Sequence, residues 1–484
     1  MTQTTGKTTE IETQFELALA DKKLPSLAHA IICFLGVFLM ISLGLFVFEA
    51  SLHAIIFLAL IWATMQAALL GHSFLVIRQM MNHGIYKALP ALYIFLLVGM
   101  VIASYMQSGT IASLFYYGID LLSPVIFLPV GLVLCCLMSV ATGTSWGTVG
   151  TLGVVLMGIG DAMGIPLPIV AGMIISGATF GDKLSPISDT TNLAAMSAET
   201  SLYRHISSML YTTVPTFLIV LCLFILIGLQ YSNTQLQLNG MHVETVSDTI
   251  RLALGNVYQL NPLITLLPLM VMFGLSLKRY APEVSMSISI LVAMLIAIVY
   301  QGKNGIDVLN ALWLNSDGTT GIENLDMLLG RGGMYSMAWT LLLSVMALAL
   351  GGILHHAGFL RVLLINIIVH IRRIGTLIAT TIAAGFACNL AMGEAYISII
   401  LNSQLFKGFY EEKGIDRAVL SRSVEEGATQ TTALIPWTTT GTFYAATLGV
   451  ATLEYAPYAL LNLLNPCLSI IMAYAGIGLL KKMH

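Results

Sequence analysis

The sequence predicts an all-α protein that crosses a membrane many times and is built from two related halves. Of its 484 residues 57% are hydrophobic and only 9% are charged, whereas a soluble domain carries about 25% charged residues. Apolar stretches of the length that a helix needs to cross a bilayer, about 20 residues, recur along the chain. A net charge of −3 and the lack of a basic run give no sign of a nucleic-acid partner.

The predicted elements begin with a polar tail at residues 1–25, which lacks the pattern of a cleavable signal peptide. Because backbone polar groups must be satisfied inside the membrane, the apolar segments are expected to be helices. Two further apolar segments, 148–181 and 417–450, are interrupted by Gly, Pro, Ser and Thr, which indicates broken helices or hairpins near the bilayer midplane. The predicted spans are 28–48, 54–76, 88–106, 123–142, 205–229, 260–277, 284–300, 336–356, 376–402 and 458–480.

The chain matches itself at a shift of 250 residues. At this shift Gly143 aligns with Gly393, the Gly-Ala-Thr at 177–179 aligns with that at 427–429, and other residues match between them. A repeat of this kind indicates a duplicated unit. We therefore predict four parts: a cytoplasmic tail (1–25), a first transmembrane repeat (26–230), an extracytoplasmic connecting loop (231–259) and a second transmembrane repeat (260–480).

Basic residues in short loops predict how the two repeats face the membrane, because Lys and Arg are retained on the cytoplasmic side. Lys22, Lys23, Arg78 and Lys87 predict that segment 88–106 runs outward. In the second half the basic residues predict the opposite direction for its counterpart and place the C-terminus inside; they are Lys278, Arg279, Arg361, Arg372, Arg373, Lys481 and Lys482. Inverted repeats with broken helices are typical of transporters that bind substrate near the midplane.

The stretch "GDKLSPISDTTNLA" (181–194) concentrates polar groups in an apolar region. Pro186 removes a backbone donor and disfavours helix at the preceding residue, so the helix should break there and expose carbonyl groups. Oxygen ligands without sulfur suit a small hard cation such as Na⁺. The predicted ligands in this stretch are Asp182, Ser185, Asp189, Thr190, Thr191 and Asn192.

Asp189 is the first choice for the binding carboxylate, because an ionisable group inside a membrane is costly and is retained for function. Proton and cation would compete for this one carboxylate, which is the simplest chemistry for exchange. The Na⁺ ligands are expected to be Asp189 with oxygens of Ser185, Thr190 and Asn192. Asp189 could instead cap a helix. Asp182 and Lys183 could form a solvated pair at a membrane edge, which we favour for Lys183.

Two other polar stretches carry candidate ligands. "ATGTSWGT" (141–148) supplies Thr144 and Ser145, unless these hydroxyls bond back to helix carbonyls. In its repeat counterpart, "AMGEAYIS", Glu394 takes the position of Thr144, and a lone carboxylate in an apolar run is the second predicted binding group.

The counterpart of the first stretch, "EGATQTTALIPWTTTGT" (426–442), keeps a proline but carries hydroxyls in place of aspartates. From it we predict Thr438 and Thr439 as ligands. Glu425 and Glu426, just ahead of the predicted hairpin, either reach the cavity or cap a helix.

Three of these motifs together, "TFGDKLSPISDTTNLA", "TGTSWGT" and "GATQTTALIPWTTTG", resemble the NhaC family of Na⁺/H⁺ antiporters over roughly residues 30–480. The resemblance implies exchange of Na⁺ for H⁺ by alternating access in a bacterial cytoplasmic membrane. It implies no cofactor besides the transported ions, and it leaves a homodimer open. Some related members couple Na⁺ and H⁺ to exchange of malate for lactate, which is the alternative function.

Two other classes of protein fit the sequence less well. "GTSWG" (143–147) matches the G-x-S-x-G pattern of hydrolases, but that pattern needs a strand-to-helix turn and here lies in an apolar helical run. A passive cation channel would need a symmetric pore lining, whereas the carboxylates differ between the two halves.

Overall fold

The computed structural model describes residues 24–480 except 119–123, 233–250, 279, 317–319, 323–325, 327–328 and 369–370. The described part is helical and contains no strand, which confirms the predicted all-α class. Seven helices are long and apolar enough to cross a membrane, or ten if each sharply bent helix pair counts as one span. The chain is therefore a multi-pass membrane protein. The predicted tail up to residue 23, most of the connecting loop (233–250) and the lysines at 481–482 lie outside the described residues.

The first half begins with an apolar helix whose end is capped by Ser26, which accepts a hydrogen bond from the backbone N–H of His29. Its helices are α2 (Leu27–Phe46), α3 (Leu52–Leu69), α4 (Phe74–Lys87), α5 (Leu89–Gln107), α6 (Thr110–Gly118), α7 (Pro124–Thr142), α8 (Ser145–Thr148), a π-helical turn (Val149–Gly153), α9 (Val154–Ala162), α10 (Leu167–Leu184), α11 (Asp189–Ser197) and α12 (Leu202–Ser232).

The second half follows a short helix at 251–257. Its helices are α14 (Pro262–Thr265), α15 (Leu267–Leu277), α16 (Pro282–Val299), α17 (Gly305–Trp313), α19 (Met334–His356), α20 (Phe359–Ile368), α21 (Ile374–Met392), α22 (Ala395–Glu412), α23 (Arg417–Thr432), α24 (Thr439–Leu448), α25 (Thr452–Tyr455), a 3₁₀ turn (Ala456–Tyr458) and α26 (Leu460–Tyr474).

Two predicted spans are corrected by these boundaries. The predicted span 54–76 ends at Leu69, and its last residues belong to the separate helix α4. The predicted span 376–402 is not continuous, because Gly393 takes a left-handed conformation (φ 66°) between α21 and α22. Hydropathy alone does not detect such a break, since most residues on both sides of it are apolar.

Helix boundaries in the two halves correspond at the same shift of 250 residues. Helices α7 and α21 have the same length and the same relative ends, and α10 and α23 begin at matching positions. Helices α11 and α24 also begin at matching positions, each after a capping hydroxyl residue. The orientation of the two halves in the membrane remains a prediction.

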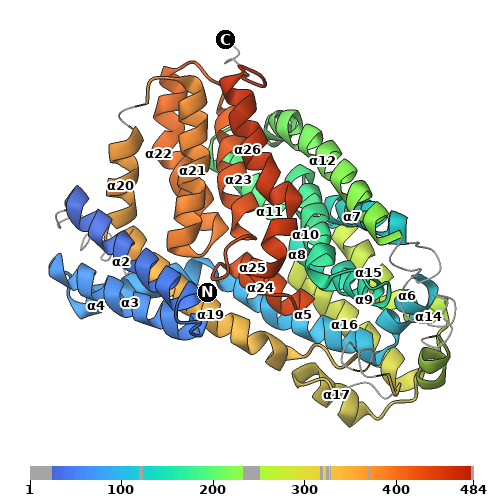
Figure 1. Ribbon diagram of the computed structural model, residues 1–484. Coiled ribbons are helices and arrows are strands. Elements are labelled where there is room, and N and C mark those ends of the chain that lie inside the picture. The colour runs from blue at the N-terminus through green and yellow to red at the C-terminus, as the bar shows by residue number, and fades with distance from the viewer. Residues whose placement is uncertain are drawn as a thin grey trace, which may run out of the picture.

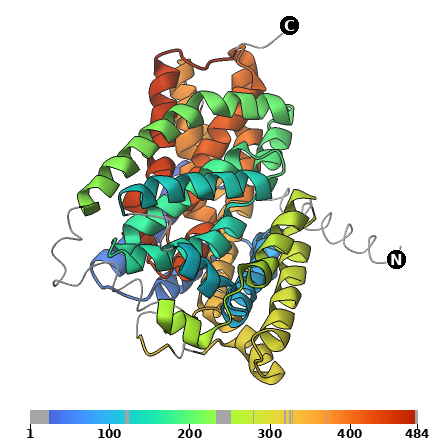
Figure 2. The ribbon, with the colours of Figure 1, turned by 90° about the vertical axis from the view of Figure 1, so that its right-hand side faces the viewer.

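Broken helices from both halves lie together in the interior. In Figure 1, α21, α22, α23 and α26 lie side by side at the end of the molecule where the chain terminates, and α7, α10 and α12 pack on their other side. Helices α2–α5 and α19 form a layer along the remaining face, and Figure 2 shows this arrangement from the side. The layer of α2–α5 and α19 therefore covers one side of the two helix groups, α21–α23 with α26 and α7, α10 and α12, next to which the breaks lie.

Glycines hold the paired helices close together next to the breaks. A Cβ on Gly181 of α10 would lie 2.4 Å from the carbonyl oxygen of Cys136 on α7. In the second half a Cβ on Gly427 of α23 would lie 2.4 Å from the carbonyl oxygen of Ile382 on α21. Small residues allow membrane helices to approach this closely, and the backbones then position the broken segments.

Candidate functional site

The four helix breaks meet around one cavity of about 250 Å³. Each break contributes residues to the lining: the α7–α8 break, the α10–α11 break, the α21–α22 break and the α23–α24 break. Irregular backbone is tolerated at membrane depth where protein or a cavity satisfies it. Polar and charged lining residues are Thr142, Thr144, Ser145, Thr179, Asp182, Asp189, Thr190, Glu394, Thr429, Thr432 and Thr440.

Two of the breaks are left-handed glycine turns followed by a capped helix. Gly143 has φ 70° and Gly393 has φ 66°, a conformation that costs a residue with a side chain about 1–2 kcal/mol. After the first, Thr144 accepts a hydrogen bond from the N–H of Gly147 at 3.3 Å. After the second, Glu394 Oε2 accepts hydrogen bonds from two backbone N–H groups of α22 at 2.5 and 3.2 Å. Glu394 therefore caps a helix and lines the cavity at the same time.

The other two breaks contain the prolines. Pro186 lies between α10 and α11, and Pro436 lies between α23 and α24. Ser188 and Thr438 then cap α11 and α24 by accepting hydrogen bonds from backbone N–H groups at 3.4 and 3.0 Å. Because proline cannot donate a backbone hydrogen bond, the helix stops, and the next helix starts with Asp189 or with a threonine.

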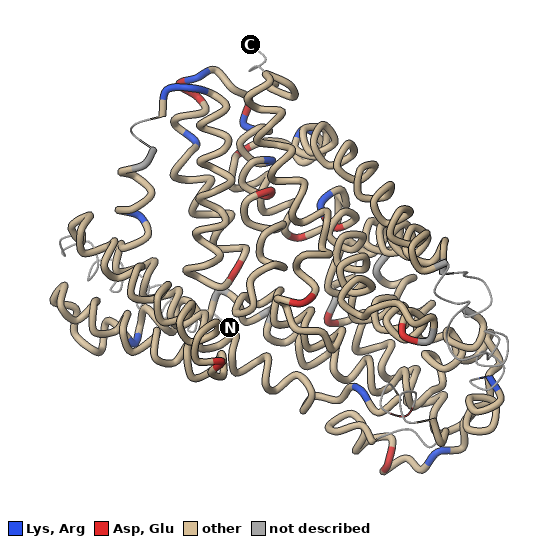
Figure 3. Tube along the Cα trace, in the orientation of Figure 1, with Lys and Arg blue, Asp and Glu red and all other residues tan. Residues whose placement is uncertain are grey.

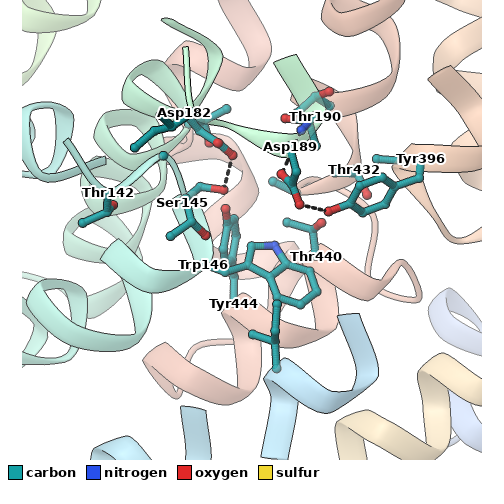
Figure 4. A pocket seen from close by; sticks show the side chains of 18 of the residues that line it. Thr142, Ser145, Trp146, Asp182, Asp189, Thr190, Tyr396, Thr432, Thr440 and Tyr444 are labelled. Carbon is teal, nitrogen blue, oxygen red and sulfur yellow. Dashed lines mark hydrogen bonds between the residues drawn. The ribbon is translucent and has the colours of Figure 1, made fainter. Parts of the chain in front are cut away.

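The two aspartates each hold a hydrogen bond from a residue of another break (Figure 4). Ser145 Oγ donates to Asp182 Oδ2 at 2.7 Å. The hydroxyl of Tyr396 on α22 donates to Asp189 Oδ2, and the N–H of Thr190 donates to Asp189 Oδ1 at 2.8 Å. These hydrogen bonds fix the positions of the carboxylate oxygens. The pairing of Tyr396 with Asp189 also connects the second half of the chain to the first.

The three carboxylates of the cavity differ in their exposure to solvent. Asp189 is exposed, whereas Asp182 is 5% exposed and Glu394 is 2% exposed. All three line the cavity, but no three His, Cys, Asp or Glu side chains in the described residues are grouped as a metal site requires. A monovalent cation needs fewer carboxylate ligands than a divalent metal ion. The remaining oxygen ligands of such a cation would come from the hydroxyl groups of the lining.

Six of the residues predicted from the sequence line the cavity: Thr144, Ser145, Asp182, Asp189, Thr190 and Glu394. The other five do not line it, and these are Ser185, Thr191, Asn192, Thr438 and Thr439. Ser185 donates to the carbonyl oxygen of Val140 at 2.8 Å, and Asn192 donates to that of Ser188 at 2.6 Å. The side chains of Ser185 and Asn192 thus satisfy backbone carbonyls near the helix breaks and do not line the cavity.

Three charged residues lie elsewhere than the sequence suggested. Lys183, for which we favoured a membrane edge, is 0% exposed. Glu425 and Glu426 neither line the cavity nor cap a helix, because they lie in the middle of α23 and are 0% exposed. All three are fully buried, and none of them lines the cavity.

The sequence reading missed two lining residues that matter chemically. Tyr396 lies inside the quoted motif "AMGEAYIS", but an aromatic side chain in an apolar span resembles ordinary core packing. Thr440 lines the cavity where the prediction named its neighbours Thr438 and Thr439. Thr190 is the second residue of α11 and Thr440 is the second residue of α24, and both line the cavity.

The charge of the lining has one sign. Within the described residues the cavity is lined by three carboxylates and by neither Lys nor Arg. A site of this kind attracts cations and disfavours anions.

A multi-pass helical protein in which broken helices enclose a carboxylate-lined cavity has the architecture of a secondary transporter. The chain belongs to the Na⁺/H⁺ antiporter family, which matches residues 7–191 and 177–477. It is 36% identical to the Na⁺/H⁺ antiporter NhaC of Alkalihalophilus pseudofirmus, over 93% of this chain and 96% of that protein.

Two other relatives carry different names. The malate-2H⁺/Na⁺-lactate antiporter of Bacillus subtilis is 34% identical over 95% of this chain and 96% of its own length. The arginine/ornithine antiporter of Halobacterium salinarum is 33% identical over 82% of this chain and 80% of its own length. Membership of the family thus defines a transporter, while its relatives are named for different transported compounds.

Proposed function

We propose that this protein exchanges Na⁺ for H⁺ across a bacterial cytoplasmic membrane. The observation that carries the proposal is the lining of the cavity by Asp182, Asp189 and Glu394, without Lys or Arg among the described residues. The similarity to NhaC Na⁺/H⁺ antiporters supports the same conclusion. Neither a resident metal nor a cofactor is part of this proposal.

Na⁺ would bind at Asp189, which is the exposed carboxylate, with hydroxyl oxygens of the lining. The lining hydroxyls in the first turns of α11 and α24 are Thr190 and Thr440, and Ser145 donates a hydrogen bond to Asp182. Proton binding to the same carboxylates removes the charge that holds Na⁺. Exchange follows because the site carries either the cation or the proton when it changes the side on which it opens.

For the alternating step we propose that the two halves act as inverted repeats that rock against each other, with both termini in the cytoplasm. Several Lys and Arg positions lie near the end of the molecule where the chain terminates, and others lie at the opposite end (Figure 3); the first group supports a cytoplasmic position for the C-terminal end. The Asp189–Tyr396 hydrogen bond crosses between the halves. It would have to be remade whenever the halves change their relative position.

Coupling to an organic acid is the second candidate. The first turns of α11, α22 and α24 all reach the cavity, and helix N-termini favour negatively charged groups such as carboxylates. The relative named for malate and lactate supports this reading. Such a substrate would have to bind together with Na⁺ or protons, because the side chains of the lining are acidic.

The test uses purified protein in liposomes with a pH-sensitive dye inside. We expect an imposed NaCl gradient alone to drive proton movement, and we expect Asp189→Asn to abolish it. Asp307→Asn, which removes an exposed carboxylate at the start of α17, is the matched control and should transport normally. Normal Na⁺-dependent transport by Asp189→Asn would contradict the site. Proton movement that appears only with malate and lactate on opposite sides would favour the second candidate.

A further inference from the structure

A second group of buried charged side chains lies beside the cavity without lining it. Its members are 0% exposed and come from α10, α12 and α23, so the group joins the two halves. Burying a charged side chain in a membrane protein costs free energy, so a group of buried charged side chains indicates a functional role. We call it the buried charged cluster, and it consists of Lys183, His205, Arg422, Glu425 and Glu426.

His205 has an oxygen atom close to each ring nitrogen, and only the contact at Nδ1 has the alignment of a hydrogen bond. Its Nδ1 lies 2.7 Å from the hydroxyl oxygen of Ser421, and its Nε2 lies 2.7 Å from Glu425 Oε2. An imidazole between a hydroxyl and a carboxylate can gain a proton on one nitrogen and lose one from the other. Histidine is also the side chain whose charge changes most readily near neutral pH.

The His205–Glu425 pair lies close to the protein surface at one end. The residue before the histidine, Arg204, forms an ion pair with Asp416 at 2.6 Å. Both line a surface hollow of about 330 Å³ where α23 begins. Arg417 also lines this hollow, and Ser421 lies one helical turn further along α23.

At its other end the pair approaches the cavity. Glu425 Oε1 lies 3.4 Å from the hydroxyl of Thr191. That hydroxyl also lies 3.1 Å from the backbone carbonyl oxygen of Asp182. The side chain of Asp182 lines the cavity, and its Oδ1 has no hydrogen-bond partner among the described residues. Thr191, which the sequence suggested as an ion ligand, thus connects Glu425 to the end of α10.

We propose that His205 and Glu425 carry the exchanged proton between the surface hollow and the Asp182 side of the cavity, by a route separate from that of Na⁺. The inference rests on the proposed Na⁺/H⁺ exchange. In the inward step the imidazole gains a proton at Nδ1 from the Ser421 hydroxyl, which regains one from a hydronium ion that enters from the surface hollow. The Nε2 proton passes to the carboxylate, so the ring ends neutral and Glu425 becomes a carboxylic acid.

Charged groups on the neighbouring helices keep this protonated state short-lived. When Glu425 is neutral, Glu426 is the one anion of the cluster that faces the two cations Lys183 and Arg422, so the cluster has an excess positive charge. Release of the proton from Glu425 restores the second negative charge and makes the charges equal again. Helices α11 and α26 add no charge here, since they contribute the hydroxyl of Thr191 and amides such as that of Asn465. The charged groups near the pair are Lys183 and Asp182 from α10 and Arg422 and Glu426 from α23, whereas Arg204 of α12 is paired with Asp416 at the surface.

The experiment measures two exchanges by the full-length protein in liposomes. Na⁺/Na⁺ exchange is followed with radioactive sodium at equal pH on both sides, and Na⁺/H⁺ exchange is followed with an internal pH dye. We expect Glu425→Gln and His205→Gln to slow Na⁺/H⁺ exchange at least tenfold, about the lower range of a lost proton-transfer group. Na⁺/Na⁺ exchange should stay within about twofold, since no proton takes part in it.

Glu454→Gln, at an exposed position on α25, is the matched control and should leave both exchanges unchanged. Loss of both exchanges together in both variants would show that the pair only holds the fold, and would overturn the proposal. Normal Na⁺/H⁺ exchange in both variants would overturn it too. A wild-type protein that exchanges Na⁺ for Na⁺ but not for H⁺ would instead contradict the proposed function itself.

Discussion

At the scale of single residues, Asp189 is the only one of the three cavity carboxylates that is exposed, and Tyr396 holds it in place. Tyr396 lies on α22 and Asp189 begins α11, so one hydroxyl fixes a carboxylate of the other half. A donated hydrogen bond limits the positions that the carboxylate oxygen can take. It therefore prearranges the site for a small cation.

Tyr396→Phe should weaken Na⁺ binding without abolishing transport. The change removes one hydrogen bond to a charged group, which contributes about 1.5–3 kcal/mol, while the phenyl ring keeps the packing. Because part of this loss is recovered when Asp189 binds Na⁺ directly, we expect the Na⁺ concentration for half-maximal exchange to rise about 5- to 10-fold. The maximal rate should change little. Unchanged Na⁺ dependence in the liposome assay would show that the hydroxyl does not position Asp189.

All three carboxylates predicted from the sequence line the cavity, whereas several of the predicted neutral residues do not. Asp182, Asp189 and Glu394 could be found because an ionisable group in an apolar span is rare, and all three line the cavity. Ser185 and Asn192 do not, because their side chains bond to nearby backbone carbonyls. Local competition of this kind depends on the geometry of the break, which residue type alone does not specify.

At the scale of elements, the four breaks determine where every lining residue lies. The approximate positions of the two breaks that contain proline could be predicted from Pro186, from Pro436 and from the repeat at a shift of 250 residues. The break between α21 and α22 was hidden inside a predicted span, because Gly393 is flanked by residues that continue a helix well. The inward turn of Lys183 was also not predictable, since it depends on the packing of α10 against the second half.

The equivalent glycines of the two halves should respond differently to substitution. Both take the left-handed conformation, so Gly143→Ala and Gly393→Ala each cost about 1–2 kcal/mol in backbone strain. A Cβ at Gly143 would also lie 2.5 Å from Cγ1 of Ile187, whereas the nearest atom to one at Gly393 is the Cβ of Ala347 at 3.2 Å. We therefore expect the lower melting temperature and the greater loss of exchange for Gly143→Ala. Equal losses in the two variants would contradict this difference.

At the scale of the whole molecule, the two halves are also joined at the surface. Glu199, in the turn between α11 and α12, lies 2.6 Å from Lys407 and 2.7 Å from Arg417 of the second half. The hydrogen bond from Lys407 lowers the pKa of the Glu199 carboxyl below its ordinary value of 4.5. These ion pairs are lost only when the pH falls through that lowered pKa, so they persist at neutral pH. Any pH dependence of exchange near neutrality must therefore arise from groups other than these surface ion pairs.

Stabilisation of the folded protein by Na⁺ should depend on pH if Na⁺ and protons share the cavity carboxylates. A cation that binds only the folded state raises stability, by about 2.7 kcal/mol at a concentration 100 times its dissociation constant. Protons that occupy the same carboxylates weaken Na⁺ binding, and by linkage Na⁺ weakens proton binding equally. We expect NaCl to raise the melting temperature most at high pH and progressively less as the pH falls.

The melting temperature is measured in NaCl and in choline chloride at equal ionic strength, between pH 5.5 and 9. Asp189→Asn should lose the Na⁺-dependent rise at every pH, whereas Asp307→Asn should keep it. A rise that is the same at all pH values would mean that Na⁺ and protons bind independently, and the shared-carboxylate mechanism would be wrong. Since this measurement needs no liposomes, it separates binding of Na⁺ from the movement of the two halves that transport also requires.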